Sequence, residues 1–381
     1  MWWARLPRPY DNVLQVCGWG GDSSGSSAII GMIAGWRCCC VGCAVYCGSS
    51  FVEDCSAFAG GVCDTPVRGG SLVVLRFTFY VSSFIFMLSI IIIAYNSAAQ
   101  LGACLRAVSE LRAPPEFEVI VVDNASGDAS AAIAAGFPGV QVVTEERNWG
   151  FAGGVNRGVR AAQGEIIALL NPDALPQPDW LVELVAPLAD ARIGVVGSKV
   201  LAPDGRIQSV GSILQQPVLL SAHRGDGERD TGQYDEIADV WSVHGAAMAF
   251  RREVWDKLEG LSEDYFPAYW EESDFCERAR GRGYRVVVAP RAVVRHAEAT
   301  TTGKYSPEFY YYYHRNRLTY LSDHFDWRYL WDKFRLAEHA RLASAPLLDR
   351  RIARLVYTHG VPPLVPLDDD RRAAILATGR A

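Results

Sequence analysis

The sequence lacks a stripe of basic residues, and it lacks the cysteine and histidine spacings of common metal-binding modules. Its 37 lysines and arginines are outnumbered by 43 aspartates and glutamates, for a net charge of −6, so we do not expect a nucleic-acid-binding protein. Eight of its ten cysteines precede residue 64. Among them the single CxxC spacing, Cys40–Cys43, has neither a second CxxC nor a histidine to complete a metal site. That arrangement suits neither a zinc site nor a regular disulfide framework. The remaining two, Cys104 and Cys276, stand in apolar sequence and predict buried thiols in a reducing compartment.

A membrane-spanning helix is also not expected. Phe77–Tyr95 is uncharged, mostly apolar and long enough to cross a bilayer. However, its second half, Ile90–Ile93, is β-branched and stops at Tyr95 and Asn96, which favours a buried strand. We therefore predict a cytoplasmic protein.

Residues 1–86 differ from the rest of the chain. They are rich in glycine, serine, cysteine and tryptophan, poor in lysine, and without sustained hydrophobic periodicity. Met87 stands directly before the first recognisable strand. Two interpretations stay open, namely a mis-assigned extension with Met87 as the natural start, which we favour, or a genuine but poorly ordered leader.

From residue 88 onward, short apolar runs alternate with helical patterns. Strands are predicted at 88–94, 118–122, 140–143, 165–170 and 193–197, and helices at about 98–111, 128–135, 151–162 and 178–189. This alternation predicts an α/β fold of βαβ units with right-handed crossovers, in which helices flank an open, mostly parallel sheet. The pair Asp204-Gly205 predicts a hairpin, and hence a small antiparallel addition.

The later part of the chain is less regular. Residues 221–238 are polar, charged and glycine-containing, and they predict a mobile loop. Beyond that loop we expect an apolar segment at 240–250, a helix at 252–258, an acidic helix from 270 and a strand at 285–289. The tail from residue 305 is aromatic and basic and predicts an amphipathic helix, with a loose end at 362–381. This tail either touches a membrane surface or packs on the core, and both alternatives stay open.

Three apolar runs end abruptly in polar residues, which is how buried parallel strands deliver side chains to the edge of a sheet where α/β proteins bind nucleotides. The first run ends at Tyr95 and Asn96. Asp123 ends the second and can bond a base or ribose, although an aspartate there also caps helices. Asn171-Pro-Asp173 ends the third, where Asp173 suits a hard cation that bridges phosphates, although this sequence is also common in turns.

Two further segments are candidates for binding and catalysis. Residues 148–157 begin a helix whose glycines let a backbone approach a ligand, and its amides together with Arg157 suit a diphosphate. A plain helix start is the alternative, because the pattern G-x-G-x-x-G is missing. Glu271, Glu272 and Asp274 open the acidic helix, where the helix dipole favours acids in any case. A base there would take a proton from a hydroxyl group.

Taken together, these residues resemble the family 2 glycosyltransferases with the GT-A fold, particularly the bacterial rhamnosyltransferase-like members. The similarity covers roughly residues 88–325. The family's motifs are matched, in order, by Tyr95-Asn96, Val122-Asp123-Asn124-Ala-Ser126, Asn148 through Gly158, Asn171-Pro-Asp173, Glu271-Glu272-Ser-Asp274 and His296. The Gln-x-x-Arg-Trp motif of processive synthases is missing, which resembles transfer of a single sugar.

The resemblance implies a GT-A domain at 87–304, with a nucleotide half at about 87–175 and an acceptor half at about 176–304, before a helical tail at 305–381. It implies inverting transfer from a nucleoside diphosphate sugar, with rhamnose from a deoxythymidine diphosphate donor as the subgroup's sugar. The acceptor would be a glycan or a lipid-linked acceptor in cell-envelope polysaccharide synthesis. If the tail touches a membrane, that contact would be peripheral and at the inner face of the plasma membrane. The divalent cofactor, Mg²⁺ or Mn²⁺, would be bound by Asp173 and His296, although a lone histidine is more often structural. The implied nucleotide-sugar-binding residues are Tyr95, Asn96, Asp123, Asn148, Gly150, Asn156, Arg157 and Asn171.

The catalytic base is where the sequence departs from the family. The usual aspartate falls on Glu272, which is one methylene longer, so Asp274 stays a second candidate. Two alternative functions also stay open. A nucleotidyltransferase would need a glycine-rich loop bearing lysine or arginine after the first strand, which residues 94–99 do not supply. A catalytically silent sugar-nucleotide-binding protein is disfavoured by the acidic cluster and by Asp173.

Overall fold

The structure is a computed structural model that describes residues 14–17, 74–77, 87–112, 116–297 and 305–359. The chain divides into two units, Met1–Phe84 and Ile85–Ala381. In the first unit, β1 (Leu14–Cys17) pairs with β2 (Val74–Phe77) in antiparallel register. The other expectations for residues 1–86, and those for 362–381, lie outside the described residues.

The second unit is built on a ten-stranded sheet with the strand order β12-β14-β8-β13-β6-β3-β4-β5, joined by β7 and β9. Its parallel part consists of β3 (Leu88–Ala94), β4 (Phe117–Asp123), β5 (Val140–Thr144) and β6 (Ile166–Leu170). Its other part consists of β7 (Ala174–Pro176), β8 (Ile193–Leu201), β9 (Ile207–Ser209), β12 (Ala238–Asp239), β13 (Ala247–Arg251) and β14 (Arg285–His296). The predicted mostly parallel sheet is confirmed, with β13 lying antiparallel to both of its neighbours.

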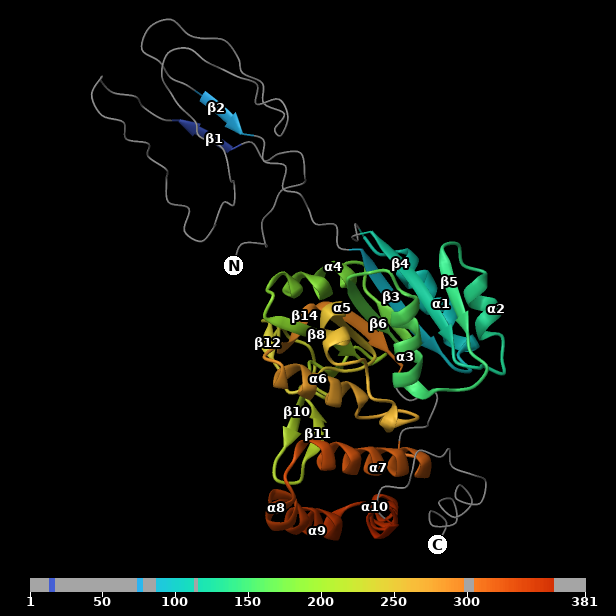
Figure 1. The fold of residues 1–381 in the computed structure, drawn as a ribbon, viewed down its shortest axis with the longest axis vertical. Helices are drawn as coiled ribbons and strands as arrows, with labels where there is room; N and C mark the ends of the chain where they lie inside the picture. The colour runs from blue at the N-terminus through green and yellow to red at the C-terminus, as the bar shows by residue number, and fades with distance from the viewer. Residues whose placement is uncertain (1–13, 18–73, 78–86, 113–115, 298–304, 360–381) are drawn as a thin grey trace, which may run out of the picture. The chain divides into compact units, whose positions relative to one another are not determined.

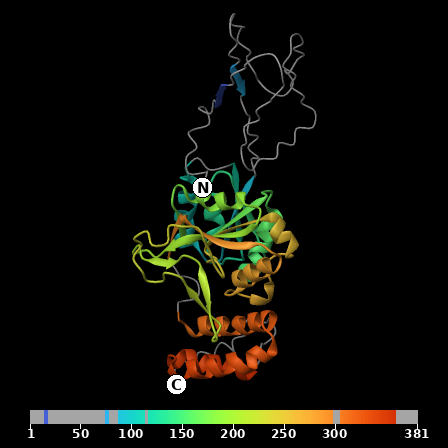
Figure 2. The same ribbon diagram turned by 90° about the vertical axis from the view of Figure 1, so that its left-hand side faces the viewer.

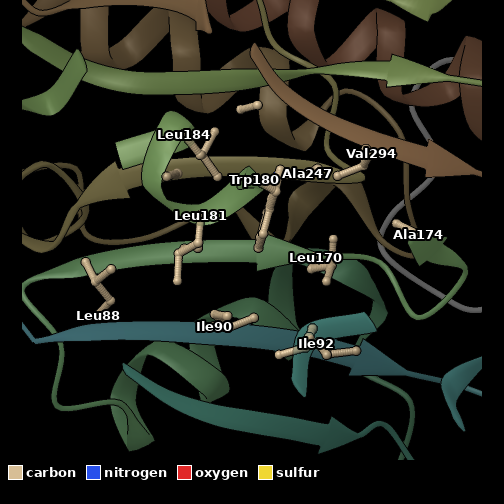
Figure 3. Packing of buried hydrophobic residues seen from close by; sticks show 14 of the residues in the cluster. Leu88, Ile90, Ile92, Leu170, Ala174, Trp180, Leu181, Leu184, Ala247 and Val294 are labelled. Atoms are coloured by element: carbon tan, nitrogen blue, oxygen red, sulfur yellow. The ribbon is translucent and has the colours of Figure 1, made fainter. Parts of the chain in front are cut away.

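Helices cover both faces of this sheet, because β3 and its neighbours alternate apolar side chains between the two sides (Figure 1). One face carries α1 (Ala98–Ser109), α2 (Ser130–Ala135) and α4 (Trp180–Val185). Figure 3 shows Trp180 and Leu184 of α4 above Ile90 of β3 in this layer. The opposite face carries α3 (Gly150–Ala161), α5 (Arg252–Lys257) and α6 (Glu271–Gly281), which pack over residues such as Ile91.

Several predicted polar residues reach the same edge of the sheet. The strands β3, β4 and β6 run parallel, so residues 95–96, Asp123 and 171–173 all follow their carboxyl ends. β14 runs parallel to β8 and brings His296 opposite Ala174 of β7. The topology therefore gathers residues that lie up to two hundred positions apart in the sequence at one edge.

The antiparallel additions differ in part from the prediction. The hairpin at Asp204-Gly205 is confirmed, since β9 returns antiparallel to β8. The loop predicted at 221–238 is wrong at its start, because β11 (Leu220–His223) pairs with β10 (Ser212–Gln215). Further along that segment, Lys199 on β8 forms ion pairs of 2.9 Å with both Asp230 and Asp235. These contacts tether a segment whose polar composition indicated only a loop.

The C-terminal tail forms a helical layer that Figure 2 shows below the sheet. Its elements are α7 (Pro307–His324), α8 (Trp327–Tyr329), a π-helical turn (Leu330–Phe334), α9 (Arg335–Ser344) and α10 (Leu347–His359). The amphipathic prediction for α7 misses one feature, which is that Arg315, Asn316 and Arg317 are buried. Across the described ranges, no helix combines the length and the apolar character needed to cross a membrane.

Candidate functional site

A large cavity opens at the carboxyl edge of the sheet. Its volume is about 1470 Å³, and its walls come from the strand ends, the start of α3, the β10–β11 hairpin, the start of α6 and the helix α7. The cavity brings together the predicted site residues Tyr95, Asn148, Gly150, Asn171, Asp173, Glu272 and His296. The predicted residues Asn96, Asp123, Asn156, Arg157 and Asp274 do not line it.

Two of the predicted residues outside the cavity wall, Asn96 and Asp123, lie at the ends of β3 and β4. The Asn96 side chain accepts a hydrogen bond of 2.8 Å from the amide of Gly127. Asp123 is 3% exposed, and its Oδ1 has no hydrogen-bond partner among the described residues. The next residue, Asn124, lines the cavity instead, and it bonds the Trp149 amide and the Gly150 carbonyl at 2.9 Å each. Asn124 thus joins the end of β4 to the start of α3.

Asn156 and Arg157 brace α3 against the segment that leads to the acidic helix. The Asn156 side chain donates to the Leu261 carbonyl at 2.8 Å and accepts from the Leu261 amide at 2.9 Å. Arg157 forms an ion pair of 3.1 Å with Glu145 and stacks over Trp149. Both side chains are therefore engaged with protein groups in this structure.

The glycines of residues 148–157 allow close packing within the protein. Gly150 has a φ of +71°, and a Cβ there would lie 2.6 Å from the Pro267 carbonyl oxygen. A Cβ on Gly154 would lie 2.7 Å from the side chain of Ile93 on β3. The glycines thus let α3 approach both the sheet and the segment before α6, because neither contact leaves room for a side chain.

Asp173 and His296 form a close pair in the cavity wall. The Asp173 Oδ1 lies 3.2 Å from the His296 Nε2, and both side chains are at most 8% exposed. On the other ring edge, His296 Nδ1 lies 3.1 Å from Gln208 Oε1. Since a carbonyl oxygen only accepts, Nδ1 is the donor in this contact, and Nε2 on the opposite ring edge faces Asp173 and lies 3.4 Å from Asn171 Nδ2.

This pair fits a divalent cation that also binds the substrate. Carboxylate oxygens and imidazole nitrogens are both common ligands of divalent cations, and this pair presents one of each to the cavity. Among the described residues, no group of three or more histidine, cysteine, aspartate or glutamate side chains is placed to hold a metal. A cation bound here would therefore complete its coordination with phosphate oxygens and water, as Mg²⁺ commonly does.

Two further histidines extend this wall, and sequence reasoning missed both. His244 packs against His296 with ring centroids 5.5 Å apart, and His223 packs against His244 at 4.9 Å. All three rings line the cavity. No spacing in the sequence indicates this row, because β11, the segment before β13, and β14 meet only in the folded chain.

The acidic helix α6 starts from a strained turn. Tyr269 and Trp270 have φ values of 82° and 78°, in the left-handed region that costs most side chains free energy. Glu271 is 4% exposed, and its Oε2 has no hydrogen-bond partner among the described residues. Burial, and secondarily the neighbouring carboxylate of Glu272, raise the pKa of Glu271 well above its usual value. The first turn of α6 is thus an unusually poorly solvated place for acids.

Glu272 and Asp274 differ in what surrounds them. Glu272 lines the cavity, and burial raises its pKa to about 7. Burial alone would also raise the pKa of Asp274, but hydrogen bonds from His324 and Arg278, both 2.8 Å long, outweigh burial and lower the pKa. Asp274 is therefore held as a paired carboxylate, whereas Glu272 titrates near neutrality beside open space.

The buried polar residues of α7 support the turn that precedes α6. Asn316 Nδ2 lies within 3.0 Å of the carbonyl oxygens of Tyr265, Ala268 and Tyr269. Arg315 donates to the carbonyl of Phe266. These backbone carbonyls, which precede α6 and are not paired in a sheet or helix, thereby receive hydrogen bonds. This explains why polar side chains are buried on α7.

Arg317 donates hydrogen bonds to backbone carbonyls of another wall of the cavity, the β10–β11 hairpin. It is fully buried, donates to the carbonyls of Val218 and Leu219 in the turn of the β10–β11 hairpin, and forms an ion pair of 2.9 Å with Glu338 of α9. The hairpin extends towards α7 in Figure 1. One helix thus holds two walls of the cavity.

Part of the chain is similar to known proteins. Residues 89–258 match the model of glycosyl transferase family 2. The chain is 32% identical over 117 residues to the glycosyltransferase AglE of Haloferax volcanii, which covers 29% of this chain and 38% of that protein. It is 37% identical over 122 residues to the succinoglycan biosynthesis protein ExoO of Rhizobium meliloti, which covers 30% of this chain and 34% of that protein.

A solved structure shares the fold. The structure of GalNAc-T7 with UDP, GalNAc and Mn²⁺ aligns with a TM-score of 0.51 at 16% identity, covering 63% of this chain and 48% of that one. The chain spans less than half the length of the curated relatives it matches first. The sheet has the predicted GT-A architecture, and the segment that matches the model of glycosyl transferase family 2, residues 89–258, contains most of its strands.

Proposed function

We propose that the chain transfers a sugar from a nucleoside diphosphate sugar to a hydroxyl group of a glycan or lipid-linked acceptor, with inversion at the anomeric carbon. The observation that supports this proposal most directly is that Glu272 and the Asp173–His296 pair line the same cavity. A base and a cation-binding pair at one cavity suit a reaction in which a proton leaves one substrate and a diphosphate leaves the other.

In the proposed reaction, the acceptor oxygen attacks the anomeric carbon from the side opposite the diphosphate. The bond between that carbon and the phosphate oxygen breaks, and its electron pair leaves with the nucleoside diphosphate. The acceptor's hydroxyl proton passes to a carboxylate oxygen of Glu272. A base with a pKa of about 7 is deprotonated often enough at neutral pH and still binds the proton usefully.

The diphosphate end of the donor is assigned to the Asp173–His296 side. A divalent cation bound by Asp173 and His296 would supply positive charge to the departing diphosphate. Tyr95, Asn148 and Asn171 line the cavity and are proposed to bind the nucleotide sugar, together with Asn124. Asn156 and Arg157 are proposed to act indirectly, by holding α3 and the segment before α6 in place.

The substrate class is a proposal from the relatives. One of them is named as a succinoglycan biosynthesis protein, which supports a role in making an envelope polysaccharide. Rhamnose from a deoxythymidine diphosphate donor remains the first sugar to test, on the resemblance of the motifs alone. The alternative function is a catalytically silent protein that binds a sugar nucleotide. It stays open because Glu272 stands where the family has an aspartate, and a longer side chain is harder to align as a base.

The test is release of nucleoside diphosphate from dTDP-rhamnose and from UDP- and GDP-sugars by the purified full chain, with and without EDTA. Glu272→Gln should lower the rate by about 10²–10⁴-fold while donor binding persists, because only the proton acceptor is removed. Glu253→Gln on α5, which is more than half exposed, is the matched control and should leave the rate unchanged. Donor binding without any turnover would favour the silent binder, and a loss of only a few-fold in Glu272→Gln would remove the base assignment.

A further inference from the structure

A row of aromatic rings leads away from the acidic helix along the cavity wall. Trp270 packs against Tyr313 with ring centroids 5.6 Å apart. Tyr313 stacks on Phe309 at 5.7 Å, and Phe309 contacts Tyr305 at 5.8 Å. Tyr313 and Phe309 are one helical turn apart on α7, and all four rings line the cavity. We call these four residues the aromatic row.

The aromatic row begins beside the proposed base. Trp270 directly precedes Glu271 and Glu272 at the start of α6. The rings of Phe309 and Tyr313 are half-buried, so part of each ring is exposed to the cavity, whereas Trp270 is 3% exposed and supports Tyr313 from the inner end of the row. A substrate that lay along the row would therefore have one end at Glu272 and its remainder over α7.

The cavity has room for a substrate in addition to the donor. Its volume of about 1470 Å³ exceeds the roughly 300–1,000 Å³ of a typical site for one small molecule. The proposed nucleotide-binding side is formed by residues of the sheet edge, whereas Phe309 and Tyr313 of the aromatic row lie on α7, and all four residues of the row lie beyond the matched family segment. The extra space thus coincides with a part of the chain that the family does not specify.

The chemistry of this wall favours a sugar chain over a lipid tail. Each aromatic ring has a flat apolar face that covers the C–H face of a pyranose, and tyrosine adds a hydroxyl that bonds the sugar's own hydroxyls. The same end of the cavity is lined by Glu308, and by His314 and Arg341, which both bond Asp349. Charged groups of this kind would be costly beside a hydrocarbon chain but are readily bonded by sugar hydroxyls.

We propose that the aromatic row is an acceptor subsite that binds successive pyranose rings of an oligosaccharide, so that the terminal sugar is presented to Glu272. This inference rests on the proposed function. It assigns acceptor selection to α7, and it predicts that acceptors of several sugars bind better than a single sugar.

The experiment compares acceptor kinetics for methyl glycosides and for linear tetrasaccharides of glucose, mannose, galactose and rhamnose, using the donor with the fastest acceptor-free hydrolysis. Phe309→Leu should raise the KM for the tetrasaccharide at least tenfold and the KM for the methyl glycoside less than twofold. Phe309→Tyr keeps the ring and should stay within threefold of the wild type. Trp331→Ala, an aromatic truncation at a position 59% exposed on the same tail, is the control and should change neither constant.

The outcomes separate this inference from the proposed function. If the wild type hydrolyses a donor but responds to none of the tetrasaccharides, or if Phe309→Leu behaves like Trp331→Ala, the acceptor subsite is refuted and the transferase proposal stands. If no donor is hydrolysed at all, both are refuted. If Phe309→Leu raised the KM for a polyprenyl-phosphate-linked monosaccharide as much as the KM for the tetrasaccharide, the sugar-chain assignment would be overturned, because one sugar cannot span the row.

Discussion

At the scale of single residues, the pKa of Glu272 depends strongly on its surroundings. It lies in the first turn of a helix, where the dipole stabilises a carboxylate, yet burial raises its pKa to about 7. The neighbouring Asp274 is two positions away and has its pKa lowered by Arg278 and His324. The pKa values of two acids of similar chemistry are therefore shifted in opposite directions, by burial at Glu272 and by charged partners at Asp274.

The pH dependence of the reaction follows from this difference. Glu272 accepts a proton only as a carboxylate, so kcat/KM should be level above pH 7 and fall about tenfold for each pH unit below it. A kcat/KM profile between pH 5 and 9 measures this, with a saturating divalent cation. A profile that stays level down to pH 5 would show that Glu272 does not titrate in the free enzyme at the expected pH.

At the scale of secondary-structure elements, the start of α3 depends on a close approach to the segment before α6. Gly150→Ala would combine a strained φ of +71° with a Cβ 2.6 Å from the Pro267 carbonyl oxygen. We expect it to lower the free energy of unfolding by about 3 kcal/mol. Urea denaturation followed by circular dichroism measures this change.

Gly139→Ala is the matched control for this prediction. Gly139 has a similar φ of +78°, but a Cβ there would have no atom within 4 Å. It should cost only about 1 kcal/mol, which is the conformational part of the effect. Equal losses for the two variants would mean that the contact with Pro267 contributes nothing.

Elements could be predicted from this sequence better than contacts. The β-branched run at Ile90–Ile93 and its counterparts fixed the parallel strands, because a two-sided buried strand needs apolar residues at every position. His223 and His244, which pack in a row beside the predicted His296, were missed, since the three histidines come from separate segments. The buried Asn316 was missed for another reason, which is that its partners are backbone carbonyls and leave no pattern in the sequence.

At the scale of the whole second unit, the C-terminal tail exposes apolar side chains that a protein surface rarely leaves uncovered. Trp327 is 70% exposed, Leu336 60% and Trp331 59%. Arg335 stacks on Trp331 with its guanidinium 4.5 Å from the ring centroid. Tryptophan beside a basic residue is typical of the interface between a membrane and water, so of the two alternatives left open for the tail we propose contact with a membrane surface.

The Trp327→Ala/Trp331→Ala double variant should therefore bind vesicles of phosphatidylglycerol and phosphatidylcholine at least fivefold more weakly than the wild type. Co-sedimentation of the full chain with these vesicles measures the binding. Ile213→Ala, at a position 50% exposed on the β10–β11 hairpin, is the control and should bind as the wild type does. Unchanged sedimentation of the double variant would leave the tail without a role at the membrane.

The buried guanidinium of Arg317 has an implication for protein engineering. Arg317 and Glu338 both belong to residues 305–359, so this segment keeps their ion pair wherever it is placed, but the carbonyls of Val218 and Leu219 that Arg317 also bonds lie outside it. A buried donor left without its acceptor typically costs about 1–3 kcal/mol, and more when it is charged. Grafting residues 305–359 onto another protein would therefore succeed only if the tip of the β10–β11 hairpin were moved with them. The two segments behave as one structural unit, although they are far apart in the sequence.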